Sequence, residues 1–226
     1  MHTPNRTGDR PPTPGRRVAP RGAALRTVQP RARATRDALL STARTLLSDR
    51  DFSALSIADL ASATGLSVGS FYGRFRDKEA FFALLQDQVT AEWLATARAL
   101  LAQAARQALP PRRLVGEICS ALAQAFRAES GFLRAALKHA STRPETWTPI
   151  KRTGELLGDA VVATLGPRLL HIEPAQREPR IRFALQVLYG TCVNAVLNDP
   201  GPIRLADPRL ERELERVLGA YLALDP

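Results

Sequence analysis

The chain has 226 residues and a formal net charge of +10, and its length supports one substantial core or two smaller ones without disulfides or metals. Cys119 and Cys192 lie far apart and lack metal-ligand spacing, so we expect two buried apolar thiols and no metal site. His2, His139 and His171 are too scattered to form a ligand cluster, and we expect no cofactor.

Most of the positive charge lies at the N-terminus. Residues 1–34 contain eight Arg and one Asp, so +7 of the net charge lies there. Six prolines and the lack of hydrophobic periodicity predict a disordered basic arm. This arm is either a solvated leader without a role or an extension that strengthens DNA binding without reading sequence. A transit peptide is disfavoured, because the prolines prevent the amphipathic helix that such peptides form.

No apolar run approaches the roughly 18 residues needed to span a bilayer, and the N-terminus lacks the apolar stretch of a secretory signal. We therefore expect a cytoplasmic protein without a membrane partner.

Two short helices are predicted after the arm. The first begins at Thr35 as its N-cap, and its apolar residues recur on one face: Leu39, Leu40, Ala43, Leu46 and Leu47. The second begins after Ser56, which forms a variant of the capping box with Asp59 three residues later.

From residue 78 onward the sequence predicts one helix after another, separated by Pro-bearing breaks, and no strand. The predicted helices span residues 78–107, 111–127, 129–141, 146–165, 175–197 and 208–223. The expected fold is therefore all-α with about nine helices. We divide it into the arm (1–34), a three-helix DNA-binding domain (35–80) and a ligand-sensing and dimerisation domain (81–226).

Residues 56–75, SIADLASATGLSVGSFYGRF, have the parts of a helix-turn-helix. Ala61 is small enough for close helix packing, and Gly65 suits a left-handed turn. Ser67 then caps a third helix, whose apolar residues at i, i+3 and i+7 predict a buried face: Val68, Phe71 and Phe75.

The opposite face of this third helix is nearly bare, because it carries Leu66, Gly69, Ser70 and Gly73. Each glycine costs a helix interior roughly 1 kcal/mol relative to Ala. The glycines either mark a short, frayed helix or make the helix slim enough to enter the major groove of DNA.

Tyr72, Arg74, Arg76 and Lys78 flank the bare face and are residue types that hold phosphates. On an arbitrary helix, a tyrosine with nearby cations is usually part of the solvent-exposed surface and has no binding role. The adjoining turn favours the phosphate-binding interpretation here.

The stretch Thr64–Glu79, TGLSVGSFYGRFRDKE, resembles the signature of the TetR family of bacterial regulators, with its glycine turn, aromatic-Tyr pair, Phe and Lys in register. The resemblance covers roughly residues 35–85. It implies base-facing or groove-edge positions for Val68, Gly69, Ser70 and Arg74, and phosphate contacts for Ser56, Ser67, Tyr72 and Lys78. Gly73 departs from the bulkier polar residue more usual at its position.

A single recognition helix makes too few contacts for selective binding, so we expect a homodimer that binds two half-sites of double-stranded DNA. The last two predicted helices are the expected four-helix interface, as the family resemblance also implies. The residues predicted there are Leu185, Leu188, Leu214, Val217, Leu218 and Tyr221. The alternative is that both helices belong to the core of a monomer.

Large rings and a histidine gather in the middle helices, where a small-molecule effector would bind. The candidate ligand residues are Trp93, Phe126, Phe132, His139 and Trp147, although each is also a natural core residue.

The sequence contains no catalytic residue set or Glu-x-x-His repeat, so no enzymatic activity is predicted. The expected function is a sequence-specific transcriptional regulator, a repressor that a small molecule releases from a palindromic operator. The alternative is a DNA-coating protein that binds through the basic arm without sequence preference.

Overall fold

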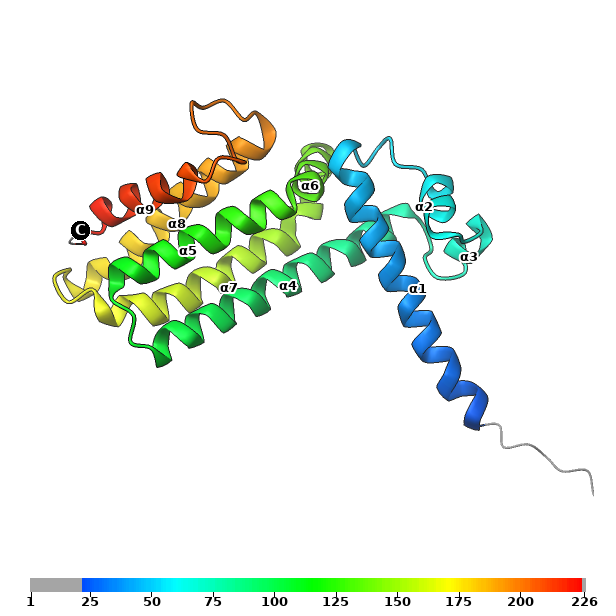
Figure 1. Cartoon of the computed structure of the whole chain (residues 1–226), viewed down its shortest axis with the longest axis horizontal. Helices are drawn as coiled ribbons and strands as arrows, with labels where there is room; N and C mark the ends of the chain where they lie inside the picture. The colour runs from blue at the N-terminus through cyan, green and yellow to red at the C-terminus, as the bar shows by residue number, and fades with distance from the viewer. Residues whose placement is uncertain (1–21, 225–226) are drawn as a thin grey trace, which may run out of the picture. The chain divides into compact units, whose positions relative to one another are not determined.

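The computed structural model describes residues 22–224, and every regular element in this range is helical (Figure 1). Nine α-helices and two short 3-10 helices lie in this range, which confirms the all-α prediction. In chain order they are α1 (Gly22–Asp49), α2 (Ile57–Thr64), α3 (Val68–Tyr72), α4 (Lys78–Arg106), α5 (Pro111–Ala128), α6 (Ser130–Thr142), η1 (Pro144–Trp147), α7 (Thr148–Leu165), η2 (Gly166–Arg168), α8 (Pro174–Leu197) and α9 (Arg209–Tyr221). Over this part of the chain, no helix has both the length and the apolar character to cross a membrane.

The described residues fall into two units that divide between Asp37 and Ala38, both of which lie in α1. The expected helix start at Thr35 was wrong, because residues 22–34 are already helical and Thr35 lies inside α1. Five of the six prolines precede this helix, and more than half of residues 22–34 are the strong helix formers Ala, Leu and Arg. The remainder of the predicted arm, residues 1–21, lies outside the described residues.

Prolines lie at the starts of three helices of the second unit, two of which, at Pro111 and Pro174, follow the Pro-bearing breaks predicted from the sequence. Pro111 opens α5, Pro149 lies in the first turn of α7, and Pro174 opens α8. Proline is tolerated there because the first backbone N–H groups of a helix have no partner within the helix. The predicted helix at 146–165 differs slightly, since its first residues belong to η1.

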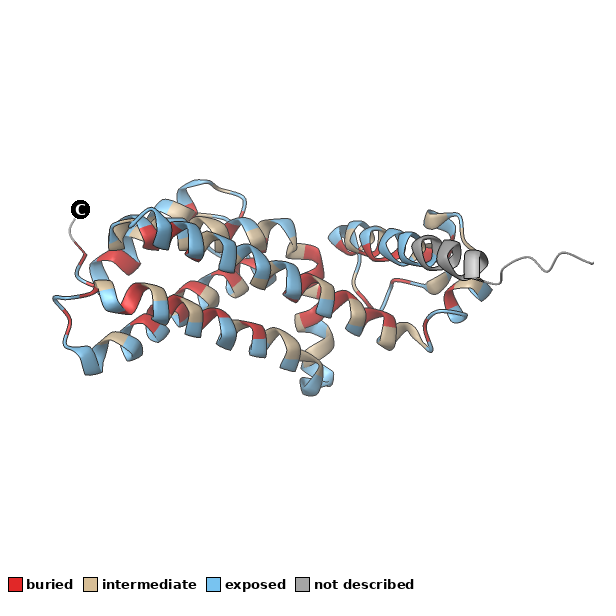
Figure 2. Cartoon of the chain, turned by 90° about the horizontal axis from the view of Figure 1, so that it is seen from below, coloured by how far each residue is buried: buried red, intermediate tan, exposed pale blue. Residues whose placement is uncertain are grey.

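The core of the second unit runs continuously from α1 to α9. The predicted apolar stripe of α1 is confirmed, with Leu46 partly buried and the other four residues fully buried: Leu39, Leu40, Ala43 and Leu47. Figure 2 shows buried positions along the mutually facing sides of the helices and exposed positions along their outer sides.

Beyond α3, the helices form a bundle in which α4 and α7 run in the same direction and α5 and α9 run in opposite directions (Figure 1). Helix α4 packs along α7 and α5 packs along α9, while α8 contacts α5, α7 and α9. Two ion pairs join α5 to α9: Arg112 Nε lies 3.4 Å from Glu215 Oε1, and Arg127 Nη2 lies 2.6 Å from Glu211 Oε1.

Both cysteines lie in this core, as predicted. Cys119 and Cys192 are fully buried free thiols. Burial raises the pKa of Cys119 to about 12 and that of Cys192 to about 11, so neither forms a reactive thiolate near neutral pH.

Candidate DNA-binding site

The N-terminus of α2 is fixed by a reciprocal capping box, as the sequence predicted. The Asp59 backbone N–H donates to Ser56 Oγ at 3.0 Å, and the Ser56 N–H donates to Asp59 Oδ2 at 3.2 Å. Hydrogen bonding from Ser56 lowers the pKa of Asp59, and Arg50, 3.3 Å away, lowers it further. These contacts hold the start of α2 at the surface, with Ser56 exposed.

The turn between α2 and α3 has the predicted left-handed geometry. Gly65 adopts φ 68°, a conformation that a residue with a Cβ rarely adopts. The Leu66 N–H donates to the Ala61 carbonyl at 2.8 Å, and Ala61 is buried between the helices. Leu66 was predicted to face outward, but it packs against the core as a partly buried residue. The prediction failed because Leu66 belongs to the turn, where helical periodicity does not apply.

Helix α3 presents its aromatic face to the core. Phe71 is fully buried and Phe75 is nearly so, and both contact Phe81 of α4 with ring centroids 5.4 Å and 5.0 Å apart. Ser67 caps the helix by accepting the Ser70 N–H at 3.1 Å. The cap and the inner face were both predicted from the sequence.

Val68 does not join this buried face, because 43% of its surface is exposed. It is the first residue of α3, one turn before Phe71, where the helix extends past the edge of the core. The burial predicted from the i, i+3, i+7 pattern was therefore wrong for Val68. Its exposure agrees with the groove-edge position that the family resemblance implied.

The exposed side of α3 is slim. Gly69, Tyr72, Gly73 and Arg74 are exposed, and Ser70 is partly exposed. Packing within the chain does not require either glycine: a Cβ at Gly69 would lie 3.8 Å from its nearest neighbour, and one at Gly73 would lie 3.4 Å from its nearest. The bare face is therefore not a consequence of crowding inside the protein.

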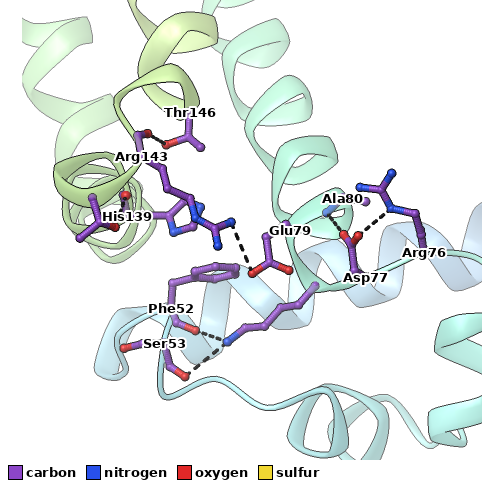
Figure 3. A network of polar contacts seen from close by, with 11 residues as sticks. Phe52, Ser53, Arg76, Asp77, Glu79, Ala80, His139, Arg143 and Thr146 are labelled. Carbon is purple, nitrogen blue, oxygen red and sulfur yellow. Dashed lines mark hydrogen bonds and ion pairs between the residues drawn. The ribbon is translucent and has the colours of Figure 1, made fainter.

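The cations next to α3 differ in how they are held. Arg74 Nη1 donates to the Ser70 carbonyl at 2.7 Å, which keeps its guanidinium beside the end of α3. Arg76 pairs with Asp77 at 2.7 Å, and Asp77 in turn caps α4 by accepting the Ala80 N–H at 2.7 Å (Figure 3).

Lys78 turns back toward the loop between α1 and α2. Its ammonium donates to the carbonyls of Phe52 and Ser53 and lies 4.3 Å from the centroid of the Phe52 ring (Figure 3). Burial lowers the pKa of Lys78. The sequence pattern did not indicate this contact, which ties the start of α4 to the loop that precedes α2.

Most of the predicted ligand residues pack on other aromatic rings. Trp93 stacks on Phe126 at 6.4 Å and meets Phe132 edge-on at 6.3 Å, while His139 packs 4.9 Å from the ring of Phe52. Trp147 is partly buried against the core. None of the predicted five lines either of the two cavities described among residues 22–224, and their role in ligand binding stays a prediction.

The predicted dimer residues fall into two groups. Four are buried within the chain, because the apolar stripes of α8 and α9 face the core: Leu185, Leu188, Leu214 and Leu218. These four are corrected to core residues. Val217 and Tyr221 are exposed as predicted, and Phe183 of α8, which the sequence did not single out, is also exposed and lies 5.5 Å from the Tyr221 ring.

A capped α2, a glycine turn and an exposed slim α3 together define a helix-turn-helix DNA-binding protein. The family profile described as bacterial regulatory proteins, tetR family, matches residues 39–85. The profile described as tetracyclin repressor-like, C-terminal domain, matches residues 110–222, half of the chain. The chain belongs to the TetR family of transcriptional regulators.

Similar proteins agree with this assignment. The HTH-type transcriptional regulator EthR of Mycobacterium tuberculosis is 41% identical over 70 residues, which cover 31% of this chain and 32% of that protein. The chain thus matches about a third of that relative's length.

The fold is also found among solved structures. A TetR-family regulator from Mesorhizobium loti, described as putative, aligns with a TM-score of 0.70 at 14% identity, over 85% of this chain and 97% of that one. A transcriptional regulator from Rhodococcus sp. Rha1 aligns with a TM-score of 0.64 at 20% identity, over 84% of this chain and 99% of that one. At these identities the likeness concerns the fold alone.

Proposed function

We propose that this TetR-family regulator is a homodimeric repressor that binds a palindromic operator through α3 and leaves it when a small molecule binds. The observation that carries the proposal is the exposed, slim side of α3 on a rigidly packed aromatic face. A helix inserted into the major groove needs small or polar groups toward the bases and a fixed inner face. Helix α3 has both.

Base reading would depend on Val68, Gly69 and Ser70 at the start of α3. Val68 offers methyl groups for apolar contact with thymine, and Ser70 offers a hydroxyl that can donate or accept. Gly69 allows the backbone to approach the base edges closely. Arg74 at the groove edge can bond guanine or a phosphate, and Tyr72 can donate its hydroxyl to a phosphate.

Phosphate contacts at the helix starts follow from the caps. The hydroxyls of Ser56 and Ser67 each accept a backbone N–H. The Ser56 hydroxyl still has a proton to donate to a phosphate oxygen next to the helix N-terminus. The Ser67 hydroxyl lies 3.0 Å from the Ser70 hydroxyl, and it can donate to a phosphate when Ser70 is the donor between the two.

The Lys78 ammonium has three N–H donors, and it uses two of them on the carbonyls of Phe52 and Ser53. We propose that it positions the loop and contributes its remaining donor to a phosphate.

Dimerisation would use the exposed apolar residues of α8 and α9, namely Phe183, Val217 and Tyr221. Exposed aromatic and aliphatic side chains that adjoin one another on neighbouring helices are typical of a protein interface. A twofold dimer would then present two copies of α3 to half-sites roughly 34–36 Å apart.

The selection of bound sites from a random pool of double-stranded DNA tests this function. A palindromic consensus with half-sites about one helical turn apart supports it, whereas a pool without enrichment contradicts it.

The alternative, DNA coating driven by the basic arm, predicts a different response to truncation. A chain that starts at residue 22 would keep its preference for the selected operator if α3 reads sequence. If the arm alone binds DNA, the truncated chain would lose most of its affinity for every DNA sequence. The remaining affinity would also depend much less on salt concentration.

A further inference from the structure

Resting on the proposed function, we infer that a cavity at the N-terminus of α6 is an effector site for a small amphipathic monocarboxylate. The cavity has a volume of about 420 Å³, which lies in the size range of small-molecule sites. Ser130 and Arg134 of α6 form one wall together with Arg127 of α5, and the end of α8 and the loop before α9 form the other. The predicted aromatic ligand residues do not take part in it.

The charged wall carries one cation that the protein does not neutralise. Arg134 is half-buried, and among residues 22–224 it has no hydrogen-bond or ion-pair partner. Arg127 differs, because its Nη2 pairs with Glu211 at 2.6 Å and its Nε donates to the Leu205 carbonyl at 2.7 Å. A free guanidinium presents parallel N–H donors that match the two oxygens of a carboxylate.

Asp199 is the only acidic residue that lines the cavity, and both of its carboxylate oxygens already have partners within the chain. Asp199 Oδ1 accepts the Leu205 N–H at 3.0 Å, and Asp199 Oδ2 lies 4.0 Å from Arg204. The hydroxyl of Ser130, within the described part of the chain, has no hydrogen-bond partner and can donate to the same carboxylate as Arg134. The cavity therefore favours a single negative charge.

The lining from α8 and the following loop combines two polar residues, Asn198 and Asp199, with five apolar ones. The apolar residues are Ala195, Val196, Leu197, Leu205 and Ala206. A fully polar anion would leave these apolar side chains exposed to water, whereas a short alkyl or aryl chain attached to the carboxylate would cover them.

Helix α6 also carries the contact through which such a ligand would act. Gly131, next to Ser130, packs against the backbone of Ser48 at the end of α1. About two turns further along α6, Lys138 pairs with Asp51 at 2.9 Å, and the His139 ring packs on Phe52. A ligand that draws Arg134 and Ser130 toward the end of α8 would shift α6, and with it the loop that precedes α2. Such a shift changes the placement of α3 and the population of DNA-binding chains.

Isothermal titration calorimetry of the full chain without DNA tests the site, with sodium hexanoate as the probe and hexan-1-ol as the neutral probe of equal length. The variant Arg134→Gln removes the charge, and Arg98→Gln removes an exposed arginine of α4 that does not line the cavity. Thermal melts of both variants establish that they fold. The affinity for the selected operator is then measured with and without hexanoate.

We expect hexanoate to bind the wild type and Arg98→Gln at one site per chain, and hexan-1-ol not to bind. Arg134→Gln should bind hexanoate about tenfold more weakly or worse, because a charge-assisted hydrogen-bond pair is lost. Hexanoate should also weaken operator binding by the wild type and not by Arg134→Gln.

Equal hexanoate binding by Arg134→Gln, equal binding of the alcohol, or no binding at all would overturn the site. Binding that depends on Arg134 but leaves operator affinity unchanged would overturn its role as an effector site. A failure to select any operator would contradict the proposed function instead, and the calorimetry on the DNA-free chain would still decide whether the cavity binds the carboxylate.

Discussion

Gly131 of α6 lies so close to Ser48 of α1 that a Cβ on Gly131 would be 2.6 Å from the Ser48 Cα. The atoms in its way are backbone atoms of α1, which cannot rotate aside. The two helices can therefore keep this approach only while residue 131 has no side chain. This contact joins the body of the protein to the segment that leads into the helix-turn-helix.

The substitution Gly131→Ala should lower the free energy of unfolding by about 1–3 kcal/mol, because it overpacks a fixed contact. The control is Gly154→Ala in α7, where no atom lies within 4 Å of the added Cβ. Alanine there should be neutral or stabilise by up to about 1 kcal/mol. Urea unfolding at one fixed protein concentration measures both, and equal effects would contradict the close approach.

Asp77 makes the stability of the α4 start depend on pH. The hydrogen bond from the Ala80 N–H, aided by Arg76, lowers the pKa of Asp77 in the folded chain. Its stabilising contribution is therefore complete above the unfolded pKa of about 3.9 and is lost as the pH falls through the lower folded pKa.

The variant Asp77→Asn should retain much of the cap at neutral pH and lose its pH dependence over that acidic range. NMR titration of the Asp77 carboxyl measures the folded pKa directly. A carboxyl that titrates at or above the ordinary value would contradict this explanation.

Tyr72→Ala should weaken binding to all DNA sequences by a similar factor, since a phosphate contact carries no base information. Fluorescence anisotropy with the selected operator and with single-base variants measures this. Tyr72→Phe isolates the hydroxyl and should reproduce most of the loss. A loss confined to one operator position would assign Tyr72 to base reading instead.

Phe183→Asp combined with Val217→Asp should convert the dimer to monomers and reduce operator affinity. Both side chains are about half exposed, so the double variant should still fold. Aspartate at Leu214 would not test the interface, because that residue is buried within the chain. The matched control is Leu170→Asp, where an apolar side chain that is 78% exposed lies outside α8 and α9. Sedimentation of an unchanged dimer would refute the proposed interface.

The features that the sequence predicted well are local. The caps at Ser56 and Ser67 and the turn at Gly65 depend on residues within three or four positions, so their side chains and spacing specify the geometry. The buried faces of α1 and α3 followed from periodicity for the same reason.

The features that the sequence did not predict depend on tertiary contacts. An apolar stripe shows which side of a helix is covered but not by what, so Leu214 and Leu218 were assigned to a partner although their own chain covers them. Gly131 looks like an ordinary helix glycine until α1 is placed beside it. Val68 deviates because α3 begins one turn before its first buried residue, Phe71.

The central claim is that α3 reads DNA sequence, and the affinity ratio between the selected operator and a scrambled duplex of equal length tests it most directly. Measured by anisotropy at one fixed salt concentration, the ratio should be on the order of 10³ or more for the wild type. It should fall when Val68 and Ser70 are exchanged for other small residues, while affinity for the scrambled duplex stays the same. A ratio near one for the wild type would contradict the claim.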